Sequence, residues 1–517
     1  MHGVFDGVVD EPWRLPSPVS QDDLSNWKER ANRVKDAFVT AYLAYEQNAY
    51  PHDELLPGTN GHADRLNGWG ATTVDGIDTM VLMGLHEMSN KTVQHVAQLT
   101  FDRDQSVQFF ETVIRYLGGF LSAYALTKNP VFLARADDLG RKLLPAFNTP
   151  SGLPTFGVNP LTGQTRSGWM GNVAILSEMG SCQMEYRYLA HLTGRPEYVR
   201  VVDHVTEHMR QHEERGGLFP TTYDLNSGDA KGNSYSVGSL ADSAYEYLIK
   251  LWLMTDRTES KYLDMYLKST EAIMNDLLYL SPARQLLFVT DAYRNNMAPT
   301  KDFQHLSCFI AGVFALGAVT IPNVDPRHAW VAEGLAHTCW ITYADSQTGL
   351  GPERVMFRNG GTKWVDEVTA WERAGKVGGV PPGVNQTAPI HEGEDMEYTP
   401  SDHRYLLRPE TIESFYILWR TTGDSKWRDR GWAMFDAIET HTKTANAYAS
   451  ISSVYNIPTK KENDMPSWFF AETLKYAYLL FTDEDLIPLN QWVFNTEAHP
   501  FPIFRWSEWE TKHLDIH

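Results

Sequence analysis

The sequence lacks several features that mark common classes of protein. Its 517 residues carry 45 Lys and Arg against 65 Asp and Glu, for a formal net charge of −20. This acidity argues against a nucleic-acid partner, because phosphate binding needs clustered Lys and Arg. No apolar run reaches the ~20 residues of a membrane-spanning helix. The first residues lack the apolar core of a signal peptide, so we expect such a peptide to be absent or to lie outside this chain.

Cysteine is also scarce. The chain has Cys182, Cys308 and Cys339, too few for a disulfide framework. Composition alone leaves two readings open: one bridge with a free thiol, or three buried thiols. Two glycosylation sequons, at Asn90 and Asn385, lean towards a secretory route but arise often by chance.

Several catalytic signatures are missing as well. The sequence contains no Walker phosphate loop, no HExxH zinc motif, no GxSxG nucleophile elbow and no CxxC pair. Hydrophobic residues make up 42% and aromatic residues 12%, which predicts a large folded core. The many Trp and Tyr residues suit either sugar stacking or core packing.

A helical repeat runs through the chain. An apolar helical run ends in a Thr-containing turn, and an aromatic residue then opens a more polar helix; the turns contain Thr127, Thr193, Thr255, Thr422 and Thr482. The first helix of most pairs is apolar on nearly every side and the second is amphipathic, which predicts an inner and an outer helix. About seven such hairpins predict an all-α fold, an (α/α)7 toroid with small loop and hairpin elements; an open solenoid would need polar capping repeats.

The repeat predicts one domain. We expect residues 22–517 to form this domain and 1–21 to form an extended, proline-containing arm. The ranges 24–47 and 74–87 are expected to pair as the first hairpin. The range 358–404 is rich in Gly, Pro and charge and is predicted to be a long insertion loop.

Charged residues on the predicted inner helices are the informative ones. Glu111 and Arg115 lie one turn apart, followed by small residues that leave room. This pattern predicts that they form part of the wall of a polar cavity. The alternative is an ordinary i,i+4 ion pair on a helix face exposed to water. Asp242 lies in the first turn of another predicted inner helix. The helix dipole stabilises a negative charge there, so Asp242 could be a simple N-terminal acid without a role in the cavity.

Three further acids lie on the last inner helices. Glu410 and Glu413 share one face and repel each other unless a proton or cation intervenes; an acidic first turn is the alternative. Glu472 lies in an almost wholly apolar helix, so it needs a partner, a proton or a metal such as Ca²⁺, unless it forms a structural ion pair or lies at the surface. Several acids around one cavity are what glycoside hydrolysis requires.

Motifs along nearly the whole chain resemble glycoside hydrolase family 47, the class I α-1,2-mannosidases. The matching segments are Pro51-His52-Asp53-Glu54-Leu55, Phe110-Glu111-Thr112-Val113-Ile114-Arg115, Leu144-Pro145-Ala146-Phe147-Asn148-Thr149-Pro150, Leu407-Arg408-Pro409-Glu410-Thr411-Ile412-Glu413-Ser414, Ala471-Glu472-Thr473-Leu474-Lys475-Tyr476 and Asn495-Thr496-Glu497-Ala498-His499-Pro500. The resemblance implies a seven-hairpin α/α barrel. It also implies an inverting exo-hydrolase that removes α-1,2-linked mannose from high-mannose N-glycans.

The resemblance also implies roles for individual residues. Glu111 resembles the general acid, acting through a water, and Glu410 the general base. Asp242 and Glu353 match further acids counted as catalytic, with the division of roles left open. The positions that match the sugar site are Arg115, Glu178, Leu240, His305, Arg408, Glu413 and Glu472.

A calcium site and a disulfide are implied in the same way. Thr496 resembles the direct protein ligand of Ca²⁺, while Glu413, Glu472 and Glu497 resemble acids that hold its waters. Cys308 and Cys339 match the family's disulfide. We further expect a monomer in the lumen of the secretory pathway or outside the cell.

Leu240 distinguishes this chain from some members of the family. This position matches an arginine of the family's endoplasmic-reticulum members, where it restricts cleavage to one branch of the glycan. A leucine here makes the chain resemble the Golgi and secreted fungal members instead. A non-catalytic mannose-binding relative in glycoprotein quality control is the alternative; it would be expected to lose a catalytic acid, and this chain keeps all four. A helical scaffold for protein partners would not need acids on inner helices.

Overall fold

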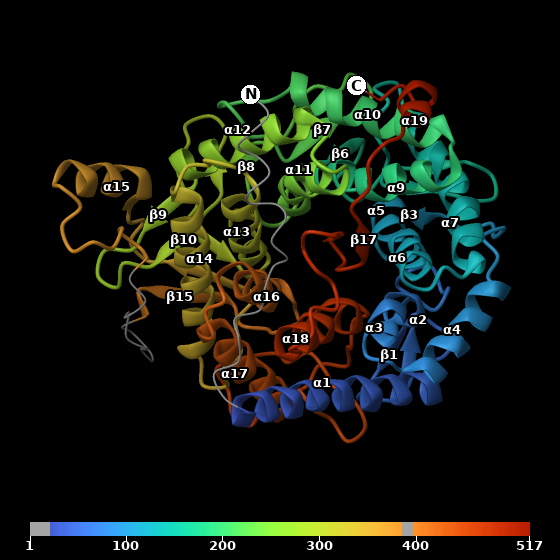
Figure 1. Ribbon diagram of the computed structural model, residues 1–517, viewed down its shortest axis with the longest axis horizontal. Coiled ribbons are helices and arrows are strands. Elements are labelled where there is room, and N and C mark those ends of the chain that lie inside the picture. The colour runs from blue at the N-terminus through green and yellow to red at the C-terminus, as the bar shows by residue number, and fades with distance from the viewer. Residues whose placement is uncertain (1–20, 385–395, 517) are drawn as a thin grey trace.

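The computed structural model describes residues 21–384 and 396–516. The predicted arm at 1–21 therefore lies outside the described residues except for Gln21, which begins the first helix. Figure 1 shows the chain travelling once round a ring. It runs from blue α1, through green α11 and α12, to red α18, which returns to α1. Among the described residues, no helix combines the length and apolarity needed to cross a bilayer.

The helices of the ring pack in pairs. The pairs in contact are α1 (Gln21–Asn48) with α18 (Leu474–Phe481), α3 (Ile77–Leu82) with α4 (His86–Gln98), α6 (Gly118–Thr127) with α7 (Pro130–Leu143), α9 (Gln183–Thr193) with α10 (Pro196–Gln211), α11 (Asp242–Met254) with α12 (Ser260–Asp276), α13 (Phe309–Thr320) with α14 (Arg327–Ala344), and α16 (Glu410–Thr422) with α17 (Lys426–His441). Shorter helical segments are α2 (Ala71–Asp75), α5 (Phe109–Glu111), η1 (Thr112–Leu117), η2 (Leu144–Phe147), α8 (Leu176–Gly180), η3 (His305–Cys308), α15 (Trp364–Arg373), η5 (Phe469–Thr473) and α19 (Glu508–His513).

One helix of each pair faces the middle of the ring. In order, α3, α6, α9, α11, α13, α16 and α18 each contact the next, and η5, which leads into α18, contacts α3. Burial follows this arrangement: every residue of α11 after Asp242 is buried, whereas α12 buries one face only. A helix enclosed on all sides must be apolar all round, which is the pattern that the sequence shows.

The first hairpin differs from expectation. The sequence predicts that 24–47 pairs with 74–87, but α1 packs on α18, and α3 forms its hairpin with α4. The pairing of α1 with α18 joins the two ends of the helical chain. An amphipathic helix of 28 residues needs an apolar surface, and helix α18, buried along most of its length, provides it.

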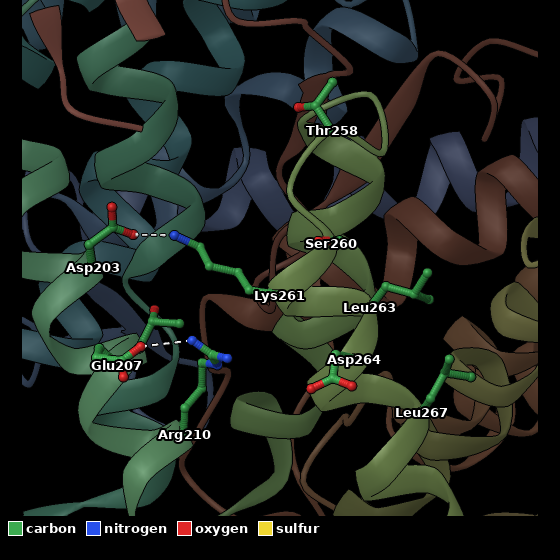
Figure 2. A pocket seen from close by; sticks show the side chains of 10 residues that line it. Asp203, Glu207, Arg210, Thr258, Ser260, Lys261, Leu263, Asp264 and Leu267 are labelled. Carbon is green, nitrogen blue, oxygen red and sulfur yellow. Dashed lines mark hydrogen bonds and ion pairs between the residues drawn. The ribbon is translucent and has the colours of Figure 1, made fainter. Parts of the chain in front are cut away.

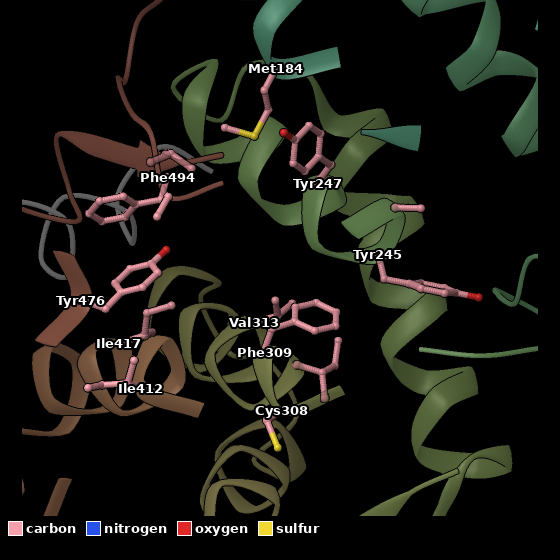
Figure 3. Packing of buried hydrophobic residues seen from close by; sticks show 14 of the residues in the cluster. Met184, Tyr245, Tyr247, Cys308, Phe309, Val313, Ile412, Ile417, Tyr476 and Phe494 are labelled. Carbon is pink, nitrogen blue, oxygen red and sulfur yellow. The ribbon is translucent and has the colours of Figure 1, made fainter. Parts of the chain in front are cut away.

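The ring is lined by a continuous apolar core. Figure 3 shows side chains from separate inner helices, among them Tyr247, Val313, Ile417 and Tyr476, packed towards one another. The bridge between Cys308 and Cys339 is present and joins η3 to α14, while Cys182 is a buried free thiol.

Small antiparallel sheets lie in the connections between the helices. They are β1 (Glu54–Leu56) with β2 (Gly61–Ala63); β3 (Val107–Gln108), β4 (Gly157–Val158) and β5 (Thr165–Arg166); β6 (Val173–Ile175) with β7 (Thr222–Asp224); β8 (Ser234–Tyr235) with β11 (Ala292–Tyr293); β10 (Leu287–Val289), β9 (Leu278–Leu280) and β14 (Thr362–Lys363); β12 (Asp302–Gln304), β13 (Arg354–Phe357) and β15 (Tyr398–Asp402); and β16 (Trp492–Phe494) with β17 (Pro500–Pro502). The β16–β17 hairpin reaches towards the centre of the ring and contacts α6 and α11 (Figure 1).

The predicted insertion loop at 358–404 contains regular structure. Strands β14 and β15 and helix α15 lie within it, and residues 385–395 are outside the described part. Trp364 and Val368, one turn apart, are the buried residues of α15, which contacts α12 and β9. The loop prediction is therefore wrong for 362–373 and 398–402. Helix α15 was missed because two apolar residues are too weak a signal among so many Gly, Pro and charged residues.

Candidate active site

A cavity of about 290 Å³ lies among the first turns of the inner helices. Its walls come from η1, α11, α16, η5 and the turn between β16 and β17, which are far apart in sequence. The acids that line it are Glu111, Asp242, Glu246, Glu410, Glu413, Glu472 and Glu497, against two arginines, Arg115 and Arg408. The cavity is therefore strongly acidic and is enclosed by apolar helices.

A larger hollow, of about 820 Å³, lies elsewhere, between outer helices α10 and α12 (Figure 2). Its charged groups already have partners: Lys261 contacts Asp203 at 3.1 Å, and Arg210 contacts Glu207 at 2.9 Å. These side chains are paired with each other, so we place the chemistry in the smaller cavity.

The carboxylate of Glu410 contacts two side chains, His305 and Arg408. His305 Nδ1 lies 2.8 Å from Glu410 Oε2, and Arg408 Nη1 lies 3.7 Å from Glu410 Oε1. His305 is itself fixed through Nε2, 2.5 Å from the Tyr343 hydroxyl. Burial would raise the pKa of Glu410, but the His305 hydrogen bond and the Arg408 charge outweigh it and lower the pKa. Glu410 is therefore ionised, as a general base must be.

Arg408 also positions Glu353. Its Nε donates to Glu353 Oε2 at 2.7 Å, and the other oxygen, Oε1, is buried and has no hydrogen-bond partner among the described residues. Glu353 is not among the residues that line the cavity, but it contacts the lining residue Arg408.

Trp468 lies between the two arginines of the cavity. The guanidinium carbons of Arg408 and Arg115 lie 5.4 and 5.5 Å from its ring centroid. Its indole N–H donates to the Leu406 carbonyl at 3.1 Å, which fixes the ring. Such cation–π contacts keep both guanidinium groups in place within the cavity.

Arg115 contacts three acids. Its Nε donates to Glu111 at 2.8 Å, and its Nη1 contacts Asp75 at 3.3 Å and pairs closely with Glu497. The ion-pair alternative for Glu111 and Arg115 thus describes a real contact, but the pair lines the cavity, with Arg115 buried and Glu111 half-buried.

Asp242 has an environment opposite to that of Glu410. Burial, and then the charges of Glu246 and Glu410, raise its pKa to about 7, against the hydrogen bond that it accepts from the Ser243 backbone N–H. Asp242 can therefore carry a proton near neutral pH. Two carboxyl groups whose pKa values are driven apart in one cavity are a common basis for acid and base roles.

Glu413 belongs to a cluster with Glu246, Lys250 and Tyr476. Lys250 pairs closely with Glu246 and lies 3.6 Å from Glu413, while the Tyr476 hydroxyl donates to Glu413 at 3.3 Å. Burial is the main cause that raises the pKa of Glu413 to about 8, and the Lys250 charge offsets only part of it.

Thr496 stands at the tip of the β16–β17 hairpin and lines the cavity. Within the described ranges, neither its carbonyl oxygen nor its hydroxyl makes a hydrogen bond. The same holds for the carboxylate of Glu472, although that side chain is buried. Burial, and then the charges of Glu497, Glu410 and Glu413, raise the pKa of Glu472 well above its usual value. Unpaired hard oxygens beside excess acid are the donor set that suits Ca²⁺.

Three predicted sugar-site residues, Glu178, Leu240 and His305, are not among those that line the cavity; His305 reaches it through Glu410. Glu178 is near Glu111, and burial together with that charge raises its pKa to about 7. Leu240 is half-buried in a left-handed conformation (φ 75°), and its carbonyl accepts from the N–H of the cavity residue Ser177 at 3.0 Å.

Glu246, Lys250 and Trp468 belong to the site but were not predicted from the sequence. Glu246 follows Asp242 by one helical turn, and Lys250 follows by one more, so both were charged residues on an inner helix and could have been found by the same reasoning. Trp468 gave no comparable signal, because aromatic residues are common in the core.

Comparison with known proteins agrees with this geometry. The model of Glycosyl hydrolase family 47 matches residues 37–503. The chain is 37% identical over 486 residues to the Spodoptera frugiperda mannosyl-oligosaccharide alpha-1,2-mannosidase IA, covering 92% of this chain and 67% of that protein. It is 34% identical to an Arabidopsis thaliana mannosyl-oligosaccharide 1,2-alpha-mannosidase, covering 96% and 82%.

A solved structure shares the fold. The alpha-1,2-mannosidase from Trichoderma reesei superposes with a TM-score of 0.81 at 33% identity, over 92% of this chain and 99% of that one. A D-mannose isomerase, at 13% identity and a TM-score of 0.51, shares the fold alone. With its acid-lined cavity and a family match over most of its length, the chain is a glycoside hydrolase that belongs to glycosyl hydrolase family 47.

Proposed function

We propose that the chain is a calcium-dependent, inverting exo-α-1,2-mannosidase that trims terminal mannose from high-mannose N-glycans. The catalytic domain spans residues 22–517 as a closed (α/α)7 barrel. The relatives' names support the substrate class. The proposed mechanism rests on one observation: the surroundings lower the pKa of Glu410, which is ionised, and raise the pKa of Asp242 to about 7. A cavity of about 290 Å³ suits one terminal sugar ring, as exo action requires.

In this mechanism Glu410 is the general base that activates the attacking water. His305 orients its carboxylate, and Arg408 keeps it ionised. The proton for the leaving oxygen comes from Glu111 through a water or from Asp242, which can carry a proton near neutral pH. Inverting enzymes keep base and acid ~6.5–9.5 Å apart, so that a water fits between base and sugar.

Thr496 would hold Ca²⁺ directly, through its carbonyl and hydroxyl oxygens. Glu413, Glu472 and Glu497 would hold the surrounding waters, which accounts for so many carboxylates around one cavity. When bound, Ca²⁺ supplies positive charge and free coordination positions for sugar hydroxyls.

The setting follows from the same family. High-mannose N-glycans are made in the secretory pathway, and a disulfide such as Cys308–Cys339 persists in oxidising compartments. We therefore propose a monomeric enzyme of the secretory lumen or the cell exterior, with no nucleic-acid partner.

Digestion of a nine-mannose glycan tests this function. The full chain with Ca²⁺ should release mannose, and a strong chelator should abolish release until Ca²⁺ is added back. Proton NMR of the first-formed mannose should show the β anomer, because inversion at an α bond gives β. An α product rejects the inverting mechanism. Binding of the glycan without any release would instead favour the non-catalytic relative.

Replacing Glu410 by Gln should remove the base while keeping the shape of the side chain. We expect kcat to fall by ~10²–10⁴-fold with a much smaller change in KM, since general-base catalysis is worth about that much. Steady-state kinetics on an α-1,2-mannobioside measure both values. Glu207→Gln, which changes an exposed acid of the outer hollow, is the matched control and should behave as the unmodified chain. Equal kcat values for the two variants would rule out Glu410 as the base.

Calcium should stabilise the protein more at high pH. In the metal-free protein, burial raises the pKa of Glu413 to about 8 and those of Glu472 and Glu497 well above the usual value. A raised carboxyl pKa gives stability below the unfolded pKa of ~4.3 that is lost as pH rises through the folded value. Ca²⁺ offsets these charges, so the gain in Tm on adding Ca²⁺ should be larger at pH 8 than at pH 6, and Glu472→Gln should reduce the difference. A gain independent of pH would contradict a carboxylate-held ion.

Leu240 should permit broad trimming. Leu offers no hydrogen bond, so we expect removal of several α-1,2 mannoses, towards the five-mannose core. Leu240→Arg should slow the later cuts by roughly 10- to 100-fold more than the first, since one charged hydrogen bond is worth ~1.5–3 kcal/mol. Leu240→Met is the control, as it retains an apolar side chain at the same left-handed residue. Product mass spectra over time measure this, and a clean stop of the unmodified chain at one eight-mannose isomer would show that Leu240 does not set branch choice.

A further inference from the structure

A cluster of potential metal ligands lies on the β1–β2 hairpin, apart from the acid-lined cavity. One ligand atom each from His52, His62 and Asp64 lies within 4.8 Å of the others. His52 Nδ1 is 2.7 Å from Asp64 Oδ2, and the rings of His52 and His62 lie face to face with centroids 3.5 Å apart. These three residues are the only group of this kind found in the described ranges.

The backbone around the cluster is firmly held. His62 pairs with Leu55 across the hairpin, and Asp64 follows two residues later, so the two side chains share one face. The second oxygen of Asp64, Oδ1, accepts the backbone N–H of Asp53 at 3.1 Å. Asp53 in turn accepts the backbone N–H groups of residues 66 and 68–71. The hydrogen bond from Asp53 thus fixes the orientation of the Asp64 carboxylate that a metal would use. Such hydrogen bonds commonly orient the ligands in metal sites.

The donor chemistry differs from that of the acid-lined cavity. Two imidazoles and one carboxylate suit Zn²⁺ and the neighbouring transition metals, whereas a threonine carbonyl with carboxylates suits Ca²⁺. His52 and Asp64 are each about 40% exposed, so an ion can reach them from solvent, and a water can complete a four-coordinate shell.

We propose that His52, His62 and Asp64 bind one divalent transition-metal ion of the Zn²⁺ class, which ties the β1–β2 hairpin together. The exposed ring of His62 turns out of its stack with His52, so that each ligand nitrogen comes within ~2.0–2.1 Å of the ion. The hairpin also contacts the wall of the cavity, because Glu54 accepts the backbone N–H of Ser467, next to Trp468, at 3.1 Å. The ion would therefore add stability to a segment that supports this wall.

Isothermal titration calorimetry of the untagged full chain with ZnCl₂, in excess Ca²⁺, tests the proposal. Excess Ca²⁺ keeps the acid-lined cavity from competing for Zn²⁺. We expect one Zn²⁺ per chain and a higher Tm in its presence. His62→Gln should bind Zn²⁺ at least about tenfold more weakly and lose the gain in Tm, since even indirect partners of a metal are worth ~10–100-fold. His86→Gln, an exposed histidine of α4 outside the cluster, should match the unmodified chain.

Three results would overturn the proposal. No heat and no gain in Tm for the unmodified chain would mean that no site exists. Equal binding by the unmodified chain, His62→Gln and His86→Gln would place the ion elsewhere. If His62→Gln has a lower Tm without zinc than the unmodified chain, His52→Gln replaces it, and retention of Zn²⁺ binding by that variant likewise rejects the cluster. Mannose release does not enter any of these readouts, so failure of the zinc site can be distinguished from failure of the proposed activity.

Discussion

The structure depends on one electrostatic constraint: many carboxylates share a small cavity inside a ring of apolar helices. Like charges in a poorly solvated space repel strongly, and each also loses hydration. Arg115, Arg408, Lys250 and His305 each contact at least one of these acids. Asp242, Glu410 and Glu413 also lie in the first turns of α11 and α16, where the helix dipole favours negative charge. These positive groups offset the charge of some carboxylates more than that of others. This difference separates the pKa of Glu410 from that of Asp242.

Closure of the ring brings these acids together. Glu111 and Glu497 are almost four hundred residues apart, yet both contact Arg115. A buried network beneath the cavity fixes the hairpin that carries Thr496 and Glu497. His499 lies 2.7 Å from Asp78 and 3.3 Å from Asp75, and Lys475 contacts Asp78 at 2.8 Å. The hairpin is thereby tied to α2, α3 and α18 at once, so its tip has a fixed place in the cavity.

Two leucines near the cavity adopt a conformation that is costly for a residue with a side chain. Leu240 (φ 75°) precedes α11 by two residues, and Leu407 (φ 59°) precedes Arg408. A left-handed backbone costs a non-glycine residue roughly 1–2 kcal/mol. The surroundings hold these turns: the Leu240 carbonyl accepts from Ser177, and the Leu407 carbonyl accepts the Thr473 hydroxyl at 2.6 Å. Both turns direct the chain into an inner helix that begins with an acid.

The sequence by itself determined the helical repeat and which helix of most pairs is buried, because both follow from local periodicity. It also singled out Glu111, Asp242, Glu410, Glu413 and Glu472, since a charge on an apolar helix stands out in any context. Tertiary structure decided what local pattern cannot encode. The pairing of α1 with α18 depends on the ring's closing, and α15 depends on a surface offered by α12 and β9. The ionisation of Glu410 and the raised pKa of Asp242 arise from residues such as His305, Arg408 and Glu246, whose distances exist only in the folded chain.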